Sequence, residues 1–377
     1  MKTFCCERCQ TRVFFENTSC DVCKARLGFI PAELTLGSFD EDESGDWLRV
    51  TGTAAFRRCA NHVAPVHCNW MVGAGEAEPL CLSCRTTKVR PQLAKAENHG
   101  YWRSIEAAKR QLAYSLASWR LPFPSKAEDA RHGVAFALME QTDPEKKVLT
   151  GHDNGLITLN IAEADDAQRE RVRAQMREPY RTLLGHLRHE IGHYYWDRLI
   201  RDTPNIGKFR EMFGDERADY GKALKQHYSA PKADWQTSFV SAYASSHPWE
   251  DWAECWAHYM HLQDGLETAT SWGLQLDHAV PGGTTVRAEV IAADATDVQA
   301  KVIRHWLPVS QFINAMSRSL GGRDSYPFTM PDAVLDKLAF IHDVIGAGVR
   351  GDNPMNFTPR PAPQAAIATQ TIESTAA

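Results

Sequence analysis

The sequence predicts an α+β protein in which a mainly helical domain with a small β-sheet follows small cysteine-rich modules. Three observations support this prediction. Nine of the ten cysteines lie within the first 84 residues, short apolar runs with strand character follow them, and long stretches with helical periodicity fill most of the remaining chain. A chain of 377 residues is long enough for two or three domains with a substantial core.

Composition and charge are those of an ordinary soluble globular protein. Hydrophobic residues make up 43% of the chain and charged residues 24%, and the formal net charge is −5. This charge argues against a general nucleic-acid binder, and acidic and basic side chains balance within the first hundred residues. No run approaches about twenty apolar residues, and the start MKTFCCERCQ lacks the apolar core of a signal peptide. We therefore expect a cytoplasmic protein without membrane contact.

The first module, residues 1–27, has the cysteine spacing of a zinc ribbon. Two Cys-x-x-Cys pairs frame a span that contains the apolar run Val13-Phe14-Phe15. In a reducing compartment such pairs bind zinc as thiolates rather than forming disulfides, and free thiols or a redox pair are the alternative. A unit this small cannot fold on an apolar core alone, so the metal would supply folding free energy. Cys5 is a bystander, and the expected ligands of this structural zinc are Cys6, Cys9, Cys20 and Cys23.

The second module, residues 28–95, is expected to contain β-hairpins and a second structural zinc. An acidic run, residues 40–46, is expected to form a solvated turn ahead of the second group of cysteines. Only the last pair of its cysteines has the spacing of a zinc knuckle, and His62 and His67 are competing donors. Four thiolates make the simplest closed tetrahedral site, which leaves no position for water. Both modules could also offer a docking surface to a protein partner; the ligands expected here are Cys59, Cys68, Cys81 and Cys84.

Residues 100–348 are expected to form the main domain, which begins with a helix and two strands. Apolar residues at helical spacing predict a helix over 101–119, closed by Pro122 and Pro124. The runs GVAFALM (133–139) and GLITLNI (155–161) predict strands, the second after the turn residues Asp153-Asn154-Gly155. A free edge of the second strand would hold an extended peptide by main-chain pairing, and a plain core strand is the alternative.

The centre of the chain is the stretch LLGHLRHEIGHYYWDRLI, residues 183–200, which predicts a helix carrying a His-Glu-x-x-His motif. At about 100° per residue, His186, His189, Glu190 and His193 fall within roughly one third of the circumference. The opposite face is apolar, so the polar stripe should face a cavity or water. Two imidazoles four residues apart can bind one Zn²⁺, with the glutamate between them as general base. The alternative is a solvated polar face that matches the motif by chance.

A third zinc ligand is needed, because catalytic zinc usually holds three protein groups and one water. The stretch HPWEDWAECWAHYM predicts a helix that starts at His247-Pro248, with Glu250 and Glu254 on one face. The other face carries Trp252, Trp256 and Tyr259. Glu250 is the candidate ligand. The alternatives are that Glu250 only favours the helix dipole and that Glu254 only pairs with His258. Asp215 and Asp219 in GDERADYG are rival ligands of lower rank.

The remaining segments are predicted more coarsely. Residues 164–180 form a charged helix with a solvated face, residues 209–228 another helix, and residues 332–345 a third that follows Thr329 and Pro331. Cys255 is a small buried packing residue. Residues 349–377 are rich in proline, alanine and threonine without aliphatic periodicity, and are expected to be a disordered tail.

These motifs resemble those of bacterial zinc-binding metallopeptidases that carry an N-terminal zinc ribbon. The resemblance runs through the Cys-x-x-Cys knuckles, CANHVAPVHCNW, PLCLSC, GLITLNIAEAD, RHEIGHYYWD and HPWEDWAECWAHYM. It implies a zincin-like peptidase domain over residues 100–348. The spacing of Tyr243, Glu250 and Glu254 is also similar to that in the gluzincin domain of anthrax lethal factor. This similarity implies that Glu250 completes the zinc site, Tyr243 stabilises the oxyanion and Glu254 lies behind the metal ligands.

We therefore expect a zinc-dependent metallopeptidase with one catalytic and two structural zinc ions, acting on a peptide or protein. Zinc on His189, His193 and Glu250 lowers the pKa of its bound water, and Glu190 takes the proton during attack on the carbonyl. Tyr243, or else His258, donates a hydrogen bond to the oxyanion, and Glu254 orients a ligand histidine. The alternatives are a zinc-ribbon adaptor that binds protein or nucleic acid with an inactive zincin domain, and a zinc hydrolase of another amide.

Overall fold

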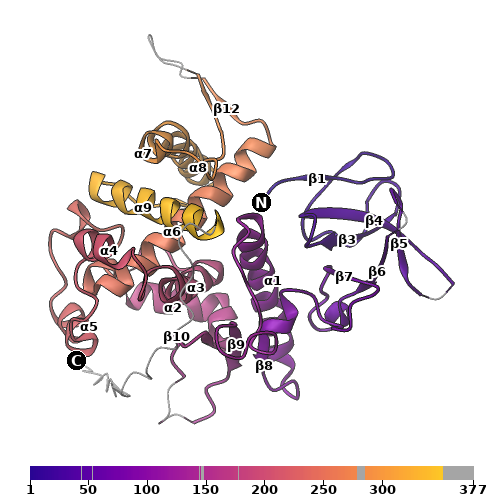
Figure 1. The fold of residues 1–377 in the computed structure, drawn as a ribbon, viewed down its shortest axis with the longest axis horizontal. Helices are drawn as coiled ribbons and strands as arrows, with labels where there is room; N and C mark the ends of the chain where they lie inside the picture. The colour runs from indigo at the N-terminus through magenta and orange to yellow at the C-terminus, as the bar shows by residue number, and fades with distance from the viewer. Residues whose placement is uncertain are drawn as a thin grey trace.

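The computed structural model describes residues 1–350 except 44, 53, 144, 146–147, 177 and 278–284. It confirms the α+β fold class: β-rich N-terminal modules lie beside a mainly helical body (Figure 1). The predicted tail lies outside the described residues except for Val349 and Arg350, which end the last helix. None of the helices in the described ranges combines the length and the apolar character needed to cross a bilayer.

The N-terminal part contains one small hairpin and one five-stranded antiparallel sheet. Strand β1 (Phe4–Cys5) pairs with β2 (Arg12–Val13), and short 3₁₀ turns η1 (Ala60–His62) and η2 (Cys84–Thr86) lie near the second cysteine set. The predicted boundary between residues 27 and 28 falls inside the first strand of the sheet, so the two modules share it. The sheet has the order β3 (Arg26–Ile30), β4 (Thr35–Glu41), β5 (Trp47–Arg49), β6 (Ala55–Arg58) and β7 (Met71–Gly73).

An aromatic cluster joins these modules to the helical body. Phe15 and Phe29 pack against Trp70 and also against Tyr114 of helix α1 (Ala96–Ser118), with ring centroids between 4.8 and 6.1 Å apart. All four side chains belong to the same buried core. The modules and the body therefore share one apolar core. Helix α1 begins at Ala96, five residues before the predicted start of the helix at residue 101.

A four-stranded sheet lies under the helices, in the order β10 (Gly151–Asp153), β11 (Leu156–Asn160), β9 (Ala135–Met139) and β8 (Thr87–Val89). Strand β8 falls within the predicted second module but pairs with β9. The structure corrects one expectation: GLITLNI has no free edge, because β11 is flanked by parallel β9 and antiparallel β10. The outermost strand on that side is β10. This strand has only three residues, which are too few for an alternating pattern to be recognised in the sequence.

Two long helices form the centre of the body. Helix α3 (Leu183–Leu199) begins after Thr182, whose hydroxyl accepts a hydrogen bond from Gly185 N, and helix α6 (Pro248–Ser271) begins after His247. Gly192 lets them approach closely, because a Cβ there would lie 3.1 Å from Ala253 Cα. In the polar stripe of α3, His189, Glu190 and His193 are buried, and His186 is partly exposed.

The segment between α3 and α6 differs from the prediction. One helix was expected over residues 209–228, but α4 (Ile206–Phe213) ends at Gly214, whose φ of +103° breaks the helix. Asp219 then caps the separate helix α5 (Tyr220–Ser229). The 3₁₀ turns η4 (Trp235–Thr237) and η5 (Ala244–Ser246) complete this segment, whereas η3 (Ile161–Ala164) and helix α2 (Asp166–Gln175) precede α3.

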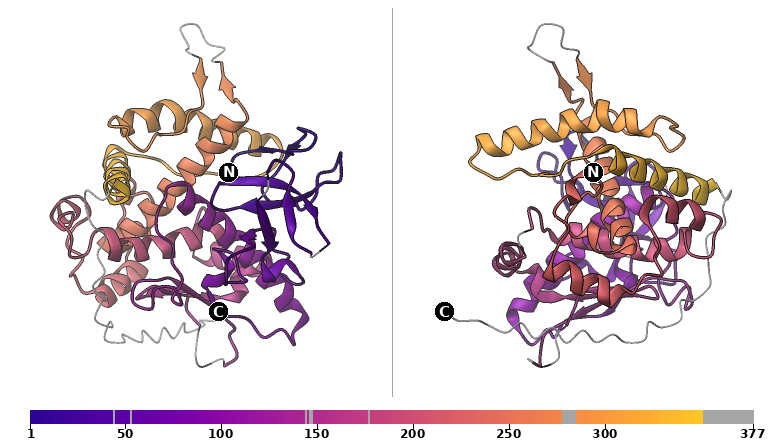
Figure 2. Two further views of the ribbon diagram at one scale, coloured as in Figure 1. Left: turned by 45° about the vertical axis from the view of Figure 1, so that its right-hand side comes forward. Right: turned by 90° about the vertical axis from the view of Figure 1, so that its left-hand side faces the viewer.

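The C-terminal elements cover one side of α6 (Figure 2). The hairpin of β12 (Gln275–Leu276) and β13 (Val286–Arg287) projects from the body, and α9 (Asp332–Arg350) packs on α6 and extends beyond the predicted end. The sequence prediction missed the helical run between them, which consists of α7 (Val298–Lys301), the π-helical turn η6 (Val302–Trp306) and α8 (Leu307–Ser319).

Candidate metal centre

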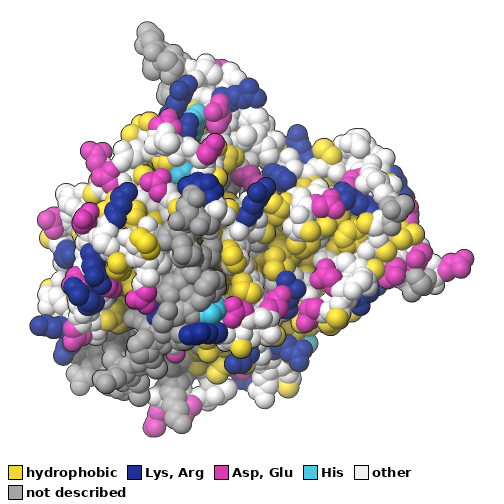
Figure 3. Space-filling model, viewed as in Figure 1, with side chains coloured by type: hydrophobic (Ala, Val, Ile, Leu, Met, Phe, Trp, Pro, Cys, Tyr) yellow, Lys and Arg dark blue, Asp and Glu magenta, His cyan; other side chains and the backbone are white. Residues whose placement is uncertain are grey.

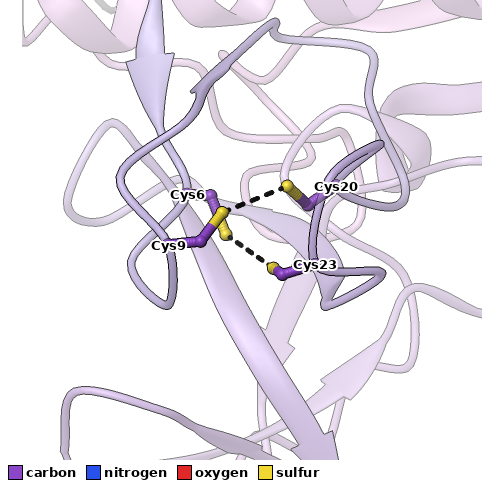
Figure 4. Close-up of side chains that lie close together, drawn as sticks. All are labelled: Cys6, Cys9, Cys20 and Cys23. Carbon is purple, nitrogen blue, oxygen red and sulfur yellow. Dashed lines mark hydrogen bonds between the residues drawn. The ribbon is translucent and has the colours of Figure 1, made fainter.

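The first cysteine set forms a compact cluster of four sulfur atoms at the start of the chain (Figure 4). The Sγ atoms of Cys6 and Cys23 lie 3.6 Å apart, as do those of Cys9 and Cys20. A tetrahedral zinc with bonds of about 2.3 Å would separate its sulfur ligands by roughly 3.8 Å. Hydrogen bonding with Thr11 lowers the pKa of Cys9 to about 6, which favours the thiolate form. The donor set therefore fits a structural zinc ion.

The second cysteine set is fully buried between the five-stranded sheet and α1. The Sγ atoms of Cys68 and Cys81 lie 3.8 Å apart, and Cys59 and Cys84 complete the cluster. The competing donors lie elsewhere: His62 uses Nδ1 for a hydrogen bond with the carbonyl of Cys59, and His67 is exposed. The structure thus brings together the four thiols that the sequence singled out.

Helix α1 places charged side chains beside this second set. Lys109 and Glu106 are fully buried and form an ion pair of 3.0 Å, and Glu106 Oε2 lies 4.0 Å from Cys84 Sγ. Burial lowers the pKa of the Arg110 guanidinium, but the negative charges of Cys68 and Glu16 outweigh this and raise it. Four thiolates around Zn²⁺ carry a net charge of −2, which Arg110 partly offsets, whereas Lys109 is already paired with Glu106. The second cysteine set is therefore electrostatically tied to the main domain.

The third group lies where α3 and α6 meet. His189 Nε2 lies 2.9 Å from Glu250 Oε2 and 3.1 Å from His193 Nε2, and His193 Nε2 lies 3.4 Å from the same oxygen. All three residues are buried. Ligands of a tetrahedral zinc with bonds of about 2.0–2.1 Å lie roughly 3.3 Å apart. This triangle therefore has the size of one face of a zinc tetrahedron.

The pKa values of His189 and Glu250 are shifted by the contacts between these residues and their neighbours. Burial lowers the pKa of His189, but hydrogen bonds with Glu250 and Glu254 outweigh it and raise the pKa well above its usual value. Burial raises the pKa of Glu250, but His193 and His189 hold it well below its usual value. Glu250 is therefore a carboxylate, which is the form that binds a metal, whereas His189 must lose a proton to bind one.

Glu254 lies behind the ligand triangle. Its Oε1 is 2.8 Å from Nδ1 of His189, and its Oε2 accepts a hydrogen bond of 2.6 Å from Ser241 Oγ. A carboxylate at Nδ1 fixes the tautomer that leaves Nε2 free for a metal. This is the position that the resemblance implied for Glu254.

Glu190 lies beside the triangle with one oxygen engaged. Its Oε1 is 3.3 Å from Nε2 of His186. Its Oε2 is buried and has no hydrogen-bond partner within the described part of the chain. A buried carboxylate oxygen without a partner is costly unless a ligand or water satisfies it, which is consistent with a reacting water at this position.

The structure separates the remaining candidates. The Tyr243 ring lies 5.9 Å from that of His189, next to the triangle. His258 is directed elsewhere: its Nδ1 bonds the Tyr326 hydroxyl at 2.6 Å, and it takes no part in the ligand group. Burial lowers the pKa of His258 to about 4. The rival ligands are also occupied, because Asp215 pairs with Arg217 and Asp219 caps α5.

Two residues next to the triangle were not predicted. Tyr220, the first residue of α5, donates a hydrogen bond of 2.6 Å to Glu250 Oε1, so only Oε2 faces the histidines. Trp249 packs against His193 with ring centroids 3.8 Å apart and the ring planes tilted by 36°. The sequence could have indicated Trp249, because it directly precedes the candidate ligand Glu250. No sequence pattern indicated Tyr220, because its contact with Glu250 depends on how α5 packs against α6.

Comparisons with known proteins identify the family of this chain. Residues 3–95 match a zinc-ribbon domain, and residues 98–344 match the family described as "putative zinc-binding metallo-peptidase". An uncharacterized protein of Mycobacterium bovis and one of Mycobacterium tuberculosis are each 42% identical over 348 residues, which cover 92% of this chain and 95% of the relative. No solved structure gives a significant match. The chain therefore belongs to the "putative zinc-binding metallo-peptidase" family and carries an N-terminal zinc-ribbon domain.

Proposed function

We propose that this protein hydrolyses peptide bonds as a zinc-dependent peptidase, with Glu190 as general base. One observation carries the proposal. Three ligand atoms from two helices converge into a triangle of zinc size, and the partnerless Oε2 of Glu190 lies on the same helix face. A solvated polar stripe would not bury four such side chains together.

We propose that the catalytic zinc is held by His189, His193 and Glu250, and that the two cysteine sets hold structural zincs. The triangle fits a zinc ion by donor type, spacing and burial. When bound there, zinc would polarise the substrate carbonyl and lower the pKa of water. Ser241 and Glu254 orient His189, and Tyr220 leaves a single oxygen of Glu250 directed at the two imidazoles.

The protein's own groups would carry the proton transfers. Glu190 accepts the proton of the attacking water at Oε2 and returns it to the leaving amine as the peptide bond breaks. Tyr243 donates a hydrogen bond to the developing oxyanion. Burial raises the pKa of Tyr243 well above its usual value, with Glu250 adding to the effect, so its hydroxyl stays protonated and able to donate.

The substrate would bind along β10. This strand is outermost in its sheet and antiparallel to β11, and it lies beside α3, where the His152 ring is 6.4 Å from that of His193. An extended peptide can add to such a strand by main-chain hydrogen bonds, which places its carbonyls in order beside the metal ligands. This observation favours a peptide over another amide.

The test is hydrolysis of a peptide library by wild type and by the Glu190→Gln variant. We expect cleavage by wild type, its loss with a chelator, and no cleavage by Glu190→Gln although its zinc content is unchanged. Glu97→Gln, which changes an exposed glutamate of α1, is the matched control and should cleave normally. Retained turnover in Glu190→Gln would refute the assigned base.

A further inference from the structure

Two hydrogen bonds and an ion pair connect Glu190 to the residue that precedes β10, the strand that we propose binds substrate. The Thr150 hydroxyl donates to Oε1 of Glu163, the other Glu163 oxygen bonds Nδ1 of His186, and His186 Nε2 lies 3.3 Å from Oε1 of Glu190. Thr150 directly precedes β10 and also accepts a hydrogen bond of 3.2 Å from Asn160 N. This chain of contacts is thus anchored at the strand and ends at the proposed base.

The ring of His186 is held from both sides. Each of its nitrogens faces a carboxylate oxygen, and a carboxylate can only accept, so both nitrogens act as donors. The side chains of His186 and Glu163 are 21% and 15% exposed, so neither moves freely in solvent. His186 stands one helical turn before Glu190 on α3, which sets the spacing between ring and carboxylate.

The two carboxylate oxygens of Glu190 therefore have different surroundings. Oε1 is engaged by His186, whereas Oε2 is buried without a partner among the described residues. A carboxylate free to rotate about its last torsion would present either oxygen. With Oε1 engaged, only Oε2 remains for the reacting water.

We infer that His186 is a positioning residue that fixes the carboxylate of Glu190, and that Glu163 and Thr150 support it from the substrate strand. This inference rests on the proposed function. The ring takes no part in the ligand triangle, so its effect should fall on the catalytic step rather than on zinc binding. Because Thr150 directly precedes β10, a peptide bound to that strand would also affect the orientation of the Glu190 carboxylate through Thr150, Glu163 and His186.

The test compares His186→Ala, His186→Gln and Glu163→Gln on a peptide that wild type cleaves. For His186→Ala we expect kcat to fall about 10- to 100-fold, with KM and zinc content unchanged. His186→Gln keeps one donor toward Glu190 and should recover part of kcat, and Glu163→Gln should lose less than His186→Ala. The matched control is His132→Ala, which removes a His–Asp pair of 3.2 Å that belongs neither to the ligand triangle nor to the Thr150–Glu163–His186 chain, and which should leave kcat unchanged.

Specific outcomes would overturn the inference. These are an unchanged kcat in His186→Ala, a rise in KM alone, or loss of zinc from that variant. If His186→Ala does not fold, His186→Gln and Glu163→Gln carry the test. A double-mutant cycle of His186→Gln with Glu190→Gln adds a readout independent of hydrolysis, because additive changes in Tm would contradict the pairing. Absence of cleavage by wild type would instead count against the proposed function.

Discussion

Glu254 and His189 form a contact that connects α6 to α3, with Oε1 of Glu254 2.8 Å from Nδ1 of His189. The other nitrogen of the same ring lies 2.9 Å from Glu250, one helical turn earlier. The two acids of α6 therefore hold opposite sides of one imidazole. One acid can bind a metal beside His189 while the other fixes the ring.

Glu254→Gln should weaken zinc binding at the triangle. The amide can no longer act as a charged acceptor for Nδ1–H, so the ring loses its fixed orientation. We expect zinc affinity at this site to fall about 10- to 100-fold, as measured by competition with a chelator. Ser241→Ala removes only the supporting hydrogen bond and should cost less. Equal affinity in wild type and Glu254→Gln would contradict the assigned role.

Cysteines inside the two metal-sized sets and Cys5, which lies outside them, should respond differently to substitution. Cys84→Ser should remove one zinc and lower Tm, because the metal cross-link is lost and the buried Arg110 of α1 then loses the thiolate charges beside it. Cys5→Ser should change neither zinc content nor Tm, since Cys5 is exposed and outside both sets. Metal analysis with thermal unfolding measures both. A Cys84→Ser protein as stable as wild type would rule out this coupling.

The Glu163–His186 pair should shape the pH dependence of stability. Burial raises the pKa of Glu163, but His186 and Thr150 outweigh it and lower it to about 2. Burial lowers the pKa of His186, but Glu163 and Glu190 outweigh it and raise it to about 9. The depressed Glu163 pKa gives stability that is lost as pH falls below its unfolded value of about 4.5. The raised His186 pKa gives stability that is lost as pH rises from about 6.5 through 9.

The contribution of this pair to the free energy of unfolding should therefore be greatest between about pH 4.5 and 6.5, at roughly 1–3 kcal/mol. Urea unfolding of wild type and Glu163→Gln across pH 3 to 10 measures it. The difference between the two proteins should shrink toward both ends of this range. A difference that stays constant with pH would show that the pair does not titrate as a unit.

A buried ion pair fixes the last helix. Lys337 Nζ of α9 lies 2.7 Å from Asp251 Oδ2 and donates to the carbonyl of Ser238 at 2.9 Å. Lys337→Ala would leave Asp251 buried and unpaired, which costs about 3–5 kcal/mol. Urea unfolding should show this loss, whereas Lys301→Ala, which breaks a partly exposed pair with Asp297, should change stability by less than about 0.5 kcal/mol. Equal losses in the two variants would contradict a special role for the buried pair.

The parts of the site that lie within single helices could be predicted from the sequence. The spacing of His189 and His193 fixes a shared helix face, and Pro248 with His247 marks where α6 begins. The Cys-x-x-Cys pairs likewise define their clusters locally. That Glu250 meets the histidines required a resemblance, because no local pattern states which helices pack together.

The parts that depend on tertiary packing could not be predicted. Tyr220 reaches Glu250 only because Gly214 breaks the helical run and allows α5 to turn back over α6. Strand β10 has too few residues for alternation to be visible, so the neighbouring β11 was wrongly given the free edge. His258 has the right spacing on α6 but is held by Tyr326, which lies 68 residues away in sequence.

The surface gives no sign of a strongly charged binding face in the view of Figure 3, where positive and negative side chains are interspersed. The ribbon modules contact α1 and the C-terminal end of α6, where Phe14 stacks on Trp272 at 6.3 Å. These contacts lie away from α5 and the ligand triangle. They agree with a structural role for the cysteine sets.

The central claim is that His189, His193 and Glu250 bind one metal ion together, and the most direct measurement is zinc content per chain in wild type and in Glu250→Ala. Wild type should carry three zinc ions, one for each of the three donor groups, and Glu250→Ala should carry two. Zinc retained at three per chain in Glu250→Ala, with hydrolysis intact, would contradict the account.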